Sequence, residues 1–277
     1  MKKTLTAAFL VIVLALSFAL SACSGNQPEA NQIAKSTVES VLAKKELVVG
    51  TAPGYFPFEM TDKEGKIIGF DIDVAQEIAD SLGVKLKVER FAFDGLIPAL
   101  QTGKIDMIIA GMTIRGDRAL SVSFSDPYYV TGQVLMVTKN NPGITSWEQL
   151  DVAGKSIGVS IGTTGAMLAK ELFKNAEIKD FDTLPDAGLA ATTGKVDGVV
   201  YDEPGIRVYV AQQPDSVYGV WDLMSDENLG IAVKKDDFST LQWLKSFLQS
   251  YVGGADYQAA VGKWFDRMDW MDSVVAE

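Results

Sequence analysis

The chain has 277 residues, of which 47% are hydrophobic and 22% are charged, values that are ordinary for a soluble globular protein and that exclude global disorder. This length predicts two compact units or one large one. The formal net charge is −11, and it becomes −13 if residues 1–22, which carry two lysines and no acid, are removed. Such an acidic protein repels phosphate backbones, so nucleic acid is not an expected partner.

Two residue types that dominate enzyme active sites are nearly missing from the sequence. There is no histidine, and Cys23 is the only cysteine. This excludes serine-histidine and cysteine-histidine catalysis, histidine-ligated metal, a zinc-thiolate cluster and an internal disulfide bond. An enzyme of this composition would have to use carboxylates, lysine or tyrosine as proton carriers. We expect neither a metal nor a cofactor.

Residues 1–22 have the pattern of an export signal. A positively charged start precedes an apolar run over residues 5–20 that is too short for a comfortable membrane span. The segment Leu20-Ser21-Ala22-Cys23 resembles the processing box of bacterial lipoproteins, in which the signal is cut before the cysteine and the new terminus is lipidated. We therefore expect a lipid anchor at Cys23 and a flexible tether up to residue 46; a simple signal peptide with an incidental cysteine is the alternative.

Apolar patterning predicts alternating strands and helices in the next part of the chain. Strands are expected at 47–50, 84–88 and 105–110, and helices at 72–82 and 96–101. Asp71 is a possible cap of the first helix, and Gly83 is its expected stop. Alternation of this kind is typical of an α/β unit with a parallel sheet.

The same alternation restarts after an extended segment at 133–138. Strands are expected at 156–160, 178–181, 196–201 and 229–233, and helices at 164–173, 187–193, 204–212, 238–251 and 257–264. We expect the last two helices to return to the first unit, with chain crossings near 130–138 and 225–232. One lobe would then comprise 47–132 and 231–277, and the other 133–230.

Several short motifs occur in a fixed order along this part of the chain. They are Gly50-Thr51, Tyr55-Phe56-Pro57-Phe58-Glu59, Gly69-Phe70-Asp71-Ile72-Asp73, Gly111-Met112-Thr113 with Arg118, Phe124-Ser125-Asp126-Pro127-Tyr128-Tyr129, Gly162-Thr163-Thr164-Gly165, and Asp202. Together they resemble the type II solute-binding proteins for polar amino acids (bacterial family 3), which feed ABC importers, and the resemblance covers about residues 46–268.

The resemblance has consequences for fold and function. It implies two α/β lobes, each a mostly parallel sheet flanked by helices, joined by two hinge crossings. It also implies a monomer in the periplasm or on the outer face of the cytoplasmic membrane, which captures a free amino acid by hinge closure. The partners would be the permease and ATPase subunits of an importer, and the lipid would attach the protein to the membrane.

Arg118 is the main candidate for binding an anion. Its planar guanidinium suits a carboxylate, and it follows a buried strand at the sheet edge where open α/β folds bind ligands. A surface arginine on a helix is the alternative interpretation. The resemblance implies that Arg118 holds the α-carboxylate of the ligand with help from Thr113.

Two loops in the second lobe offer groups of opposite character. Thr163 and Thr164 open a helix whose free amides and dipole attract an anion, although a plain N-cap explains them as well. Asp202 ends an apolar strand, where it can receive an ammonium group or cap the helix that starts near Pro204. The resemblance implies that Thr164 binds the same carboxylate as Arg118, and that Asp202 and the carbonyl group of Gly111 bind the ammonium.

Tyr55 and Phe93 are the aromatic candidates, at positions where rings pack against the ligand side chain in the family. Ala52 stands where relatives that bind glutamine or basic amino acids carry an acid, and Ser160 stands where some carry lysine. These two differences favour a neutral polar or modestly apolar amino acid.

Two other functions are compatible with the sequence. The same fold hosts a dehydratase that acts on aromatic amino-acid precursors, and such an enzyme would need a carboxylate near the leaving group, for instance Glu59 or Glu203. An extracellular sensing module would instead need a separate signalling partner. The transport interpretation is favoured over both.

Overall fold

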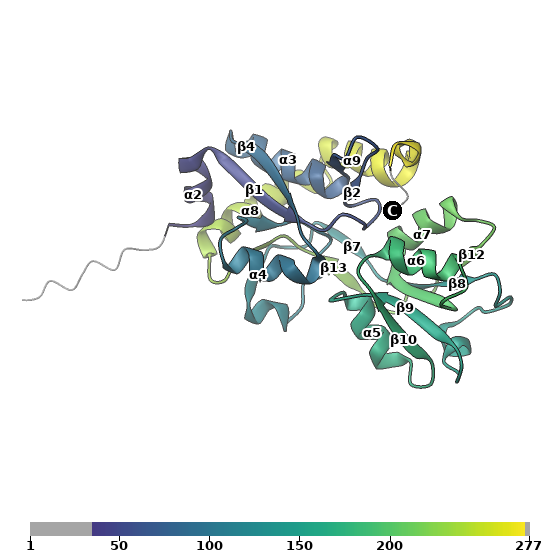
Figure 1. Ribbon diagram of the computed structural model, residues 1–277. Helices are drawn as coiled ribbons and strands as arrows, with labels where there is room; N and C mark the ends of the chain where they lie inside the picture. Colours follow the sequence, from purple (N-terminus) through teal and green to yellow (C-terminus); the bar gives the residue numbers. More distant parts are fainter. Residues whose placement is uncertain (1–34, 275–277) are drawn as a thin grey trace, which may run out of the picture. The chain divides into compact units, whose positions relative to one another are not determined.

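The computed structural model describes residues 35–274 (Figure 1). The first of its two large sheets contains β1, which corresponds to the first strand predicted from the sequence. The strand order is β4-β1-β5-β14-β6, with β1 parallel to β4 and β5 and with β14 antiparallel to β5 and β6. The strands are β1 (Glu46–Thr51), β4 (Lys85–Arg90), β5 (Met107–Ile108), β6 (Val122–Phe124) and β14 (Ala232–Lys234).

Helices bury both faces of this sheet. Along β1, Leu47 and Val49 pack in one apolar cluster with α3 and α8, whereas Val48 packs in another with α4. Successive side chains of a strand point to opposite faces, so a strand that is apolar throughout must be covered on both sides. The helices of this lobe are α3 (Phe70–Leu82), α4 (Leu96–Gln101), α8 (Phe238–Tyr251) and α9 (Ala255–Val261).

A second sheet is built from the middle of the chain. Its order is β10-β9-β11-β8-β12, and again three strands are parallel while two pair antiparallel at one side. The strands are β8 (Gln133–Thr138), β9 (Ser156–Ser160), β10 (Glu177–Phe181), β11 (Gly198–Asp202) and β12 (Val217–Val220), and the helices are α5 (Thr164–Leu172), α6 (Leu184–Thr192) and α7 (Glu203–Gln212). The predicted α/β fold class is confirmed.

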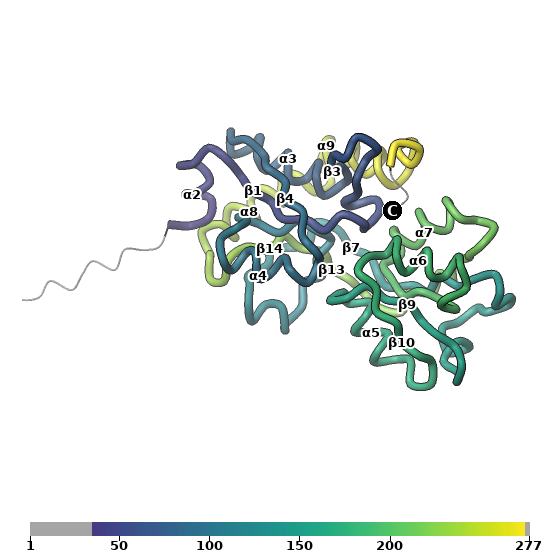
Figure 2. Tube along the Cα trace, in the orientation of Figure 1, coloured from purple at the N-terminus to yellow at the C-terminus, as the bar shows by residue number. Residues whose placement is uncertain are grey.

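Two short strands carry the chain between the sheets. β7 (Tyr129–Thr131) leads out of the first sheet and pairs antiparallel with β13 (Glu227–Leu229), which leads back to it. The returning chain enters the first sheet as β14 (Figure 2). In the strand order β14 lies between β5 and β6, which precede the second sheet in sequence. The prediction of one strand over 229–233 was wrong, because β13 pairs with β7 while β14 pairs with β5 and β6.

The folded part begins earlier than the sequence predicted. Helix α2 (Thr37–Lys44) lies inside the range 23–46 that was assigned to a tether. A capping box of Ser36 and Glu39 starts it, and Asp237 accepts a hydrogen bond of 2.7 Å from the Thr37 backbone N–H. Residues 1–22 and Cys23 lie outside the described residues. Within 35–274, no helix has both the length and the apolar character that crossing a membrane requires.

Asp71 has a different role from the one its sequence position suggested. Helix α3 is capped at Gly69, and Asp71 does not cap it. The Asp71 side chain is fully buried and accepts hydrogen bonds from the Gly111 backbone N–H at 2.7 Å and from the Tyr128 hydroxyl at 2.9 Å. Gly83 ends the helix as predicted, with a φ of 64°. Asp71 therefore supports the loop that follows β5.

Candidate ligand-binding site

One small cavity brings together residues from both sheets. Its lining comes from the segments that follow β1, β4, β5 and β9 and from the last two residues of β11, as expected for a site at the carboxyl ends of strands in open α/β sheets. The lining residues are Tyr55, Phe93, Gly111, Thr113, Arg118, Thr163, Thr164, Tyr201 and Asp202. These include every ligand-binding candidate taken from the sequence, and Tyr201 in addition.

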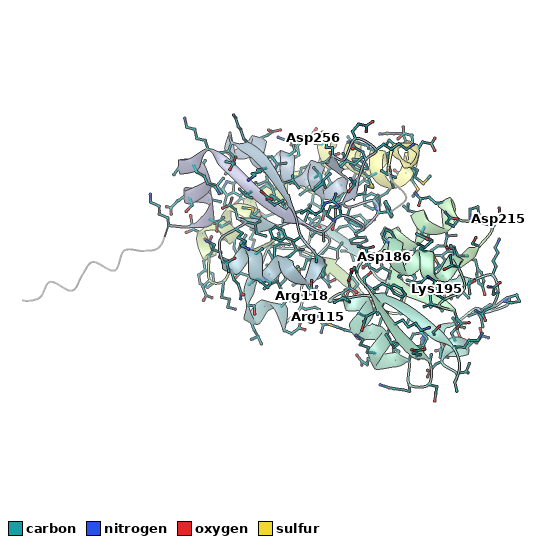
Figure 3. All side chains as sticks on the ribbon, in the orientation of Figure 1. Arg115, Arg118, Asp186, Lys195, Asp215 and Asp256 are labelled. Atoms are coloured by element: carbon teal, nitrogen blue, oxygen red, sulfur yellow. The ribbon has the colours of Figure 1, made fainter. Side chains whose placement is uncertain are left out.

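Arg118 is buried in this cavity. It opens a short 3-10 helix after β5, and only 8% of the residue is exposed, so the interpretation as a surface arginine does not hold. Its Nη1 donates to the carbonyl oxygen of Thr113 at 2.9 Å, and Nη2 donates to that of Gly162 at 3.1 Å. Burial lowers the pKa of the guanidinium. Arg118 is labelled in Figure 3 beside Arg115, which is more exposed and pairs with Asp117.

The two threonines that open α5 have different roles. The Thr163 hydroxyl accepts a hydrogen bond from the Ala166 backbone N–H at 3.1 Å, so it is the N-cap that the alternative interpretation proposed. The Thr164 hydroxyl instead lies 3.4 Å from the Thr113 hydroxyl and accepts a hydrogen bond of 3.2 Å from Nε2 of Gln133. Thr113 and Thr164 thus join the first lobe to the second beside Arg118.

Asp202 occupies the N-cap position of α7 without acting as a cap. Its side chain makes no capping hydrogen bond, and within residues 35–274 its Oδ1 atom is buried without a hydrogen-bond partner. Burial and the nearby Glu227 raise the pKa of Asp202 to about 7, while the Gln133 amide and the Arg118 guanidinium act in the opposite direction. A buried carboxylate of this kind gains stability when a cation reaches it.

Gly111 has a backbone conformation and a packing contact that favour glycine. Its φ is +53°, and a Cβ atom at this position would lie 2.2 Å from Cε1 of Tyr55. Asp71 holds the Gly111 N–H, and Tyr128 in turn donates to Asp71. This arrangement lets the Tyr55 ring pack directly on the backbone of the loop after β5.

The two carboxylates considered for an enzymatic function lie elsewhere. Glu59 is completely buried beside Asp71, and burial together with Asp71 raises the pKa of Glu59 well above its usual value. Glu203 forms an ion pair with Arg207 on α7. Neither acid lines the cavity. Among the described residues there is also no group of three or more acidic or cysteine side chains placed to hold a metal ion.

Three residues near the site were not singled out from the sequence. Tyr201 lines the cavity, and Gln133 and Glu227 are buried beside it. Gln133 is a polar residue at the start of β8, and the four residues that follow it are apolar, a signal that could have identified it. Glu227 lies in a polar segment with no distinguishing pattern, and only the fold buries it.

Two α/β lobes with two connecting crossings and a polar cavity at the strand ends define the type II class of periplasmic solute-binding proteins. Comparison with known families gives the same class. The chain belongs to the bacterial extracellular solute-binding proteins, family 3, whose model matches residues 47–267.

Individual relatives support this assignment. The chain is 37% identical over 236 residues to a probable histidine-binding protein of Campylobacter jejuni, covering 85% of this chain and 88% of the relative. A putative binding component of an ABC transporter from Wolinella succinogenes, solved in complex with lysine, has 40% identity and a TM-score of 0.80, covering 83% of this chain and all of the other. An ancestral amino acid-binding protein, described as a precursor of cyclohexadienyl dehydratase, has 38% identity and a TM-score of 0.78, with coverage of 83% and 100%.

Proposed function

We propose that this protein captures a free amino acid outside the cytoplasm and delivers it to an ABC importer. The observation that carries the proposal is the pairing of opposite charges in one cavity. Arg118 offers donors to a carboxylate, and Asp202 offers a buried acceptor without a partner among the described residues. An α-amino acid carries the two complementary charges on one carbon atom.

Each cavity residue that was a candidate from the sequence has a proposed role. Arg118, Thr113 and Thr164 bind the α-carboxylate, and Asp202 with the Gly111 carbonyl binds the α-ammonium. Thr163 contributes by capping α5, the helix that begins with Thr164. Two aromatic side chains, Tyr55 and Phe93, pack against the ligand side chain; Phe93 also lies under the Arg118 guanidinium, 5.3 Å from ring centre to Cζ.

Ligand capture is proposed to proceed by opening and closing of the lobes about β7 and β13. In this structure the cavity has room for about one water molecule. An amino acid can enter only if the contacts of Thr113 with Thr164 and of Arg118 with Gly162 separate. Contacts that a ligand makes to both lobes would then favour the closed form.

The side chain of the ligand is a separate question. Ala52 places no acid in the loop after β1, and this favours a neutral polar amino acid. The named relatives include a probable histidine-binding protein and a structure with lysine, so basic ligands must be included in any screen.

A thermal-shift screen against the twenty common amino acids tests the proposed function. A ligand that binds only the folded state raises the melting temperature, and calorimetry then gives its affinity. The expected result is stabilisation by one amino acid or a small related group, and loss of that stabilisation in Arg118→Ala. No stabilisation by any amino acid would contradict the proposal. Conversion of an aromatic amino-acid precursor in a product assay would instead support the enzymatic alternative.

The lipid anchor, the importer and the monomeric state are proposed on the sequence pattern and the family. Lipidation at Cys23 is tested by labelling cells with a fatty-acid analogue, because Cys23→Ser should abolish both the label and the membrane association. Equal labelling of the variant would refute the anchor. Light scattering of the processed chain should give the mass of one copy.

A further inference from the structure

Buried acidic side chains outnumber buried basic side chains around the cavity. Arg118 is the single cation among the lining residues, and it faces two acids, Asp202 in the lining and Glu227 on β13. Glu227 is only 4% exposed. It is close enough that, after burial, it is the largest cause raising the pKa of Asp202. The site therefore carries one more acid than base.

Two other buried acids nearby do not change this comparison. Asp71 is met by the Gly111 N–H and the Tyr128 hydroxyl. Burial and the nearby Asp71 raise the pKa of Glu59 well above its usual value, which favours its neutral form. Glu227 likewise accepts hydrogen bonds from neutral groups, the Ser225 hydroxyl at 2.8 Å and Nε2 of Gln133 at 3.5 Å. Unlike Asp71, it lies close enough to both Arg118 and Asp202 to act on their charges.

A zwitterionic ligand would leave this inequality in place. Its carboxylate would pair with Arg118 and its ammonium with Asp202, and the charge of Glu227 would stay buried without a cation. A buried charge lacking a counter-charge is costly, whereas a ligand with one additional positive group would balance the site. Once the lobes have opened, the rings of Tyr55 and Tyr201, which line the cavity, would favour such a group, because aromatic rings attract cations.

Hydrogen bonding at the site favours the same kind of ligand, because two buried oxygen atoms near Glu227 need donors. Among residues 35–274, Oδ1 of Asp202 and Oε1 of Gln133 are buried without a hydrogen-bond partner. Both residues are within reach of Glu227. A cationic side chain brings more N–H donors than a neutral one of the same size, so hydrogen bonding and charge favour the same class of ligand.

We propose that Glu227 is a specificity-determining residue, and that it makes the site prefer amino acids with a net charge of +1 over the neutral polar class that Ala52 favours. This inference rests on the proposed amino-acid function. The preference for a cationic ligand would then depend on Glu227, in the crossing strand β13, and not on Ala52 in the loop after β1.

Arginine and citrulline form the test pair, because they have nearly the same shape and differ in charge. Calorimetry on the wild-type protein should show arginine binding at least about tenfold more tightly than citrulline, a difference in the range expected for one buried charge. Lysine and norleucine form a second, shorter pair. In Glu227→Gln, which keeps an acceptor for Ser225, the affinity for the cationic ligand should fall about tenfold while that for the neutral ligand is kept, so that the ratio approaches one.

Glu171→Gln is the matched control, since it removes an exposed acid on α5 and should keep the wild-type ratio. The inference is overturned if the neutral member of each pair binds wild-type protein as tightly as the cationic one. That result needs no variant and so does not depend on folding of Glu227→Gln. It is also overturned if Glu227→Gln weakens both members equally. Binding of no amino acid at all would instead remove the proposed function itself.

Discussion

The guanidinium of Arg118 donates from Nη2 to the carbonyl oxygen of Gly162, over 3.1 Å, and thereby links the loop after β5 to the loop after β9. These loops belong to different sheets. The residue proposed to hold the ligand carboxylate therefore also holds the lobes together. Ligand binding and closure depend on the same side chain, because one guanidinium can bond a carboxylate and a carbonyl group at once.

Replacing Arg118 should strongly weaken ligand binding. We expect Arg118→Ala to cost about 2 to 5 kcal/mol of binding free energy, because the carboxylate would be buried without its partner. Calorimetry with the amino acid found in the screen measures the loss. Arg115→Ala on the same loop is the control, since the Arg115 side chain is partly exposed, pairs with Asp117 and does not line the cavity, so this variant should bind normally. Unchanged affinity in Arg118→Ala would refute the assignment.

Asp202→Asn should distinguish ligands that carry an ammonium group from those that lack it. The asparagine keeps the size of the side chain but loses its charge, so the affinity for the amino acid should fall by more than that for its desamino analogue. Competition calorimetry with both ligands gives the two losses. Equal losses would show that the Asp202 side chain does not contact the ammonium.

Ligand affinity should depend on pH through Asp202. Its pKa of about 7 in this structure means that part of the protein carries a protonated Asp202 at neutral pH. A bound ammonium favours the charged carboxylate, so binding should release protons, and affinity should fall as the pH drops below about 7. Calorimetry in buffers of different ionisation enthalpy measures the protons released. Asp202→Asn should remove most of this release.

The stability of the ligand-free protein should change with pH in the opposite sense. Burial raises the pKa of Asp71 to about 6 and that of Asp202 to about 7, above the value of about 3.9 expected in the unfolded chain. Over that window the folded state binds more protons than the unfolded state, so these groups lower the free energy of unfolding as the pH rises from about 4 to 7. Urea unfolding at several pH values should show a smaller decline in Asp202→Asn. An identical decline in both proteins would contradict the raised pKa.

Gly111→Ala should damage the site and the fold together. The new Cβ atom would overlap the Tyr55 ring, and the φ of +53° is unfavourable for alanine. We expect a loss of about 1 to 3 kcal/mol in unfolding free energy together with weaker ligand binding. Gly116→Ala is the control, because nothing lies within 4 Å of a Cβ at that position. Equal behaviour of the two variants would argue against close packing of Tyr55 on the loop.

Elements whose burial is reflected in their own local sequence pattern were predicted correctly, whereas elements defined by partners distant in sequence were not. Strand β8 and helix α4 have the predicted bounds, because each is a local run whose periodicity reflects its own burial. The segment 229–233 was predicted wrongly, since its residues divide between two sheets whose partners are distant in sequence. Asp71 has the residue type and the position of a helix cap, so the sequence suggested that role. Its actual partner, the buried Gly111 N–H, lies 40 residues away in the chain and could not be inferred from the local pattern.

Local sequence determined the α/β alternation, the residue types that can meet the two ends of an amino acid, and their placement after strands, since backbone periodicity and strand-end loops depend on near neighbours. The tertiary structure alone decided that one oxygen of Asp202 is buried without a hydrogen-bond partner among residues 35–274, that Arg118 reaches Gly162, and that Glu227 is buried near them. The physical reason is that burial and electrostatic interaction depend on which distant segments the fold brings together, and a pKa or a charge balance exists only once they have met.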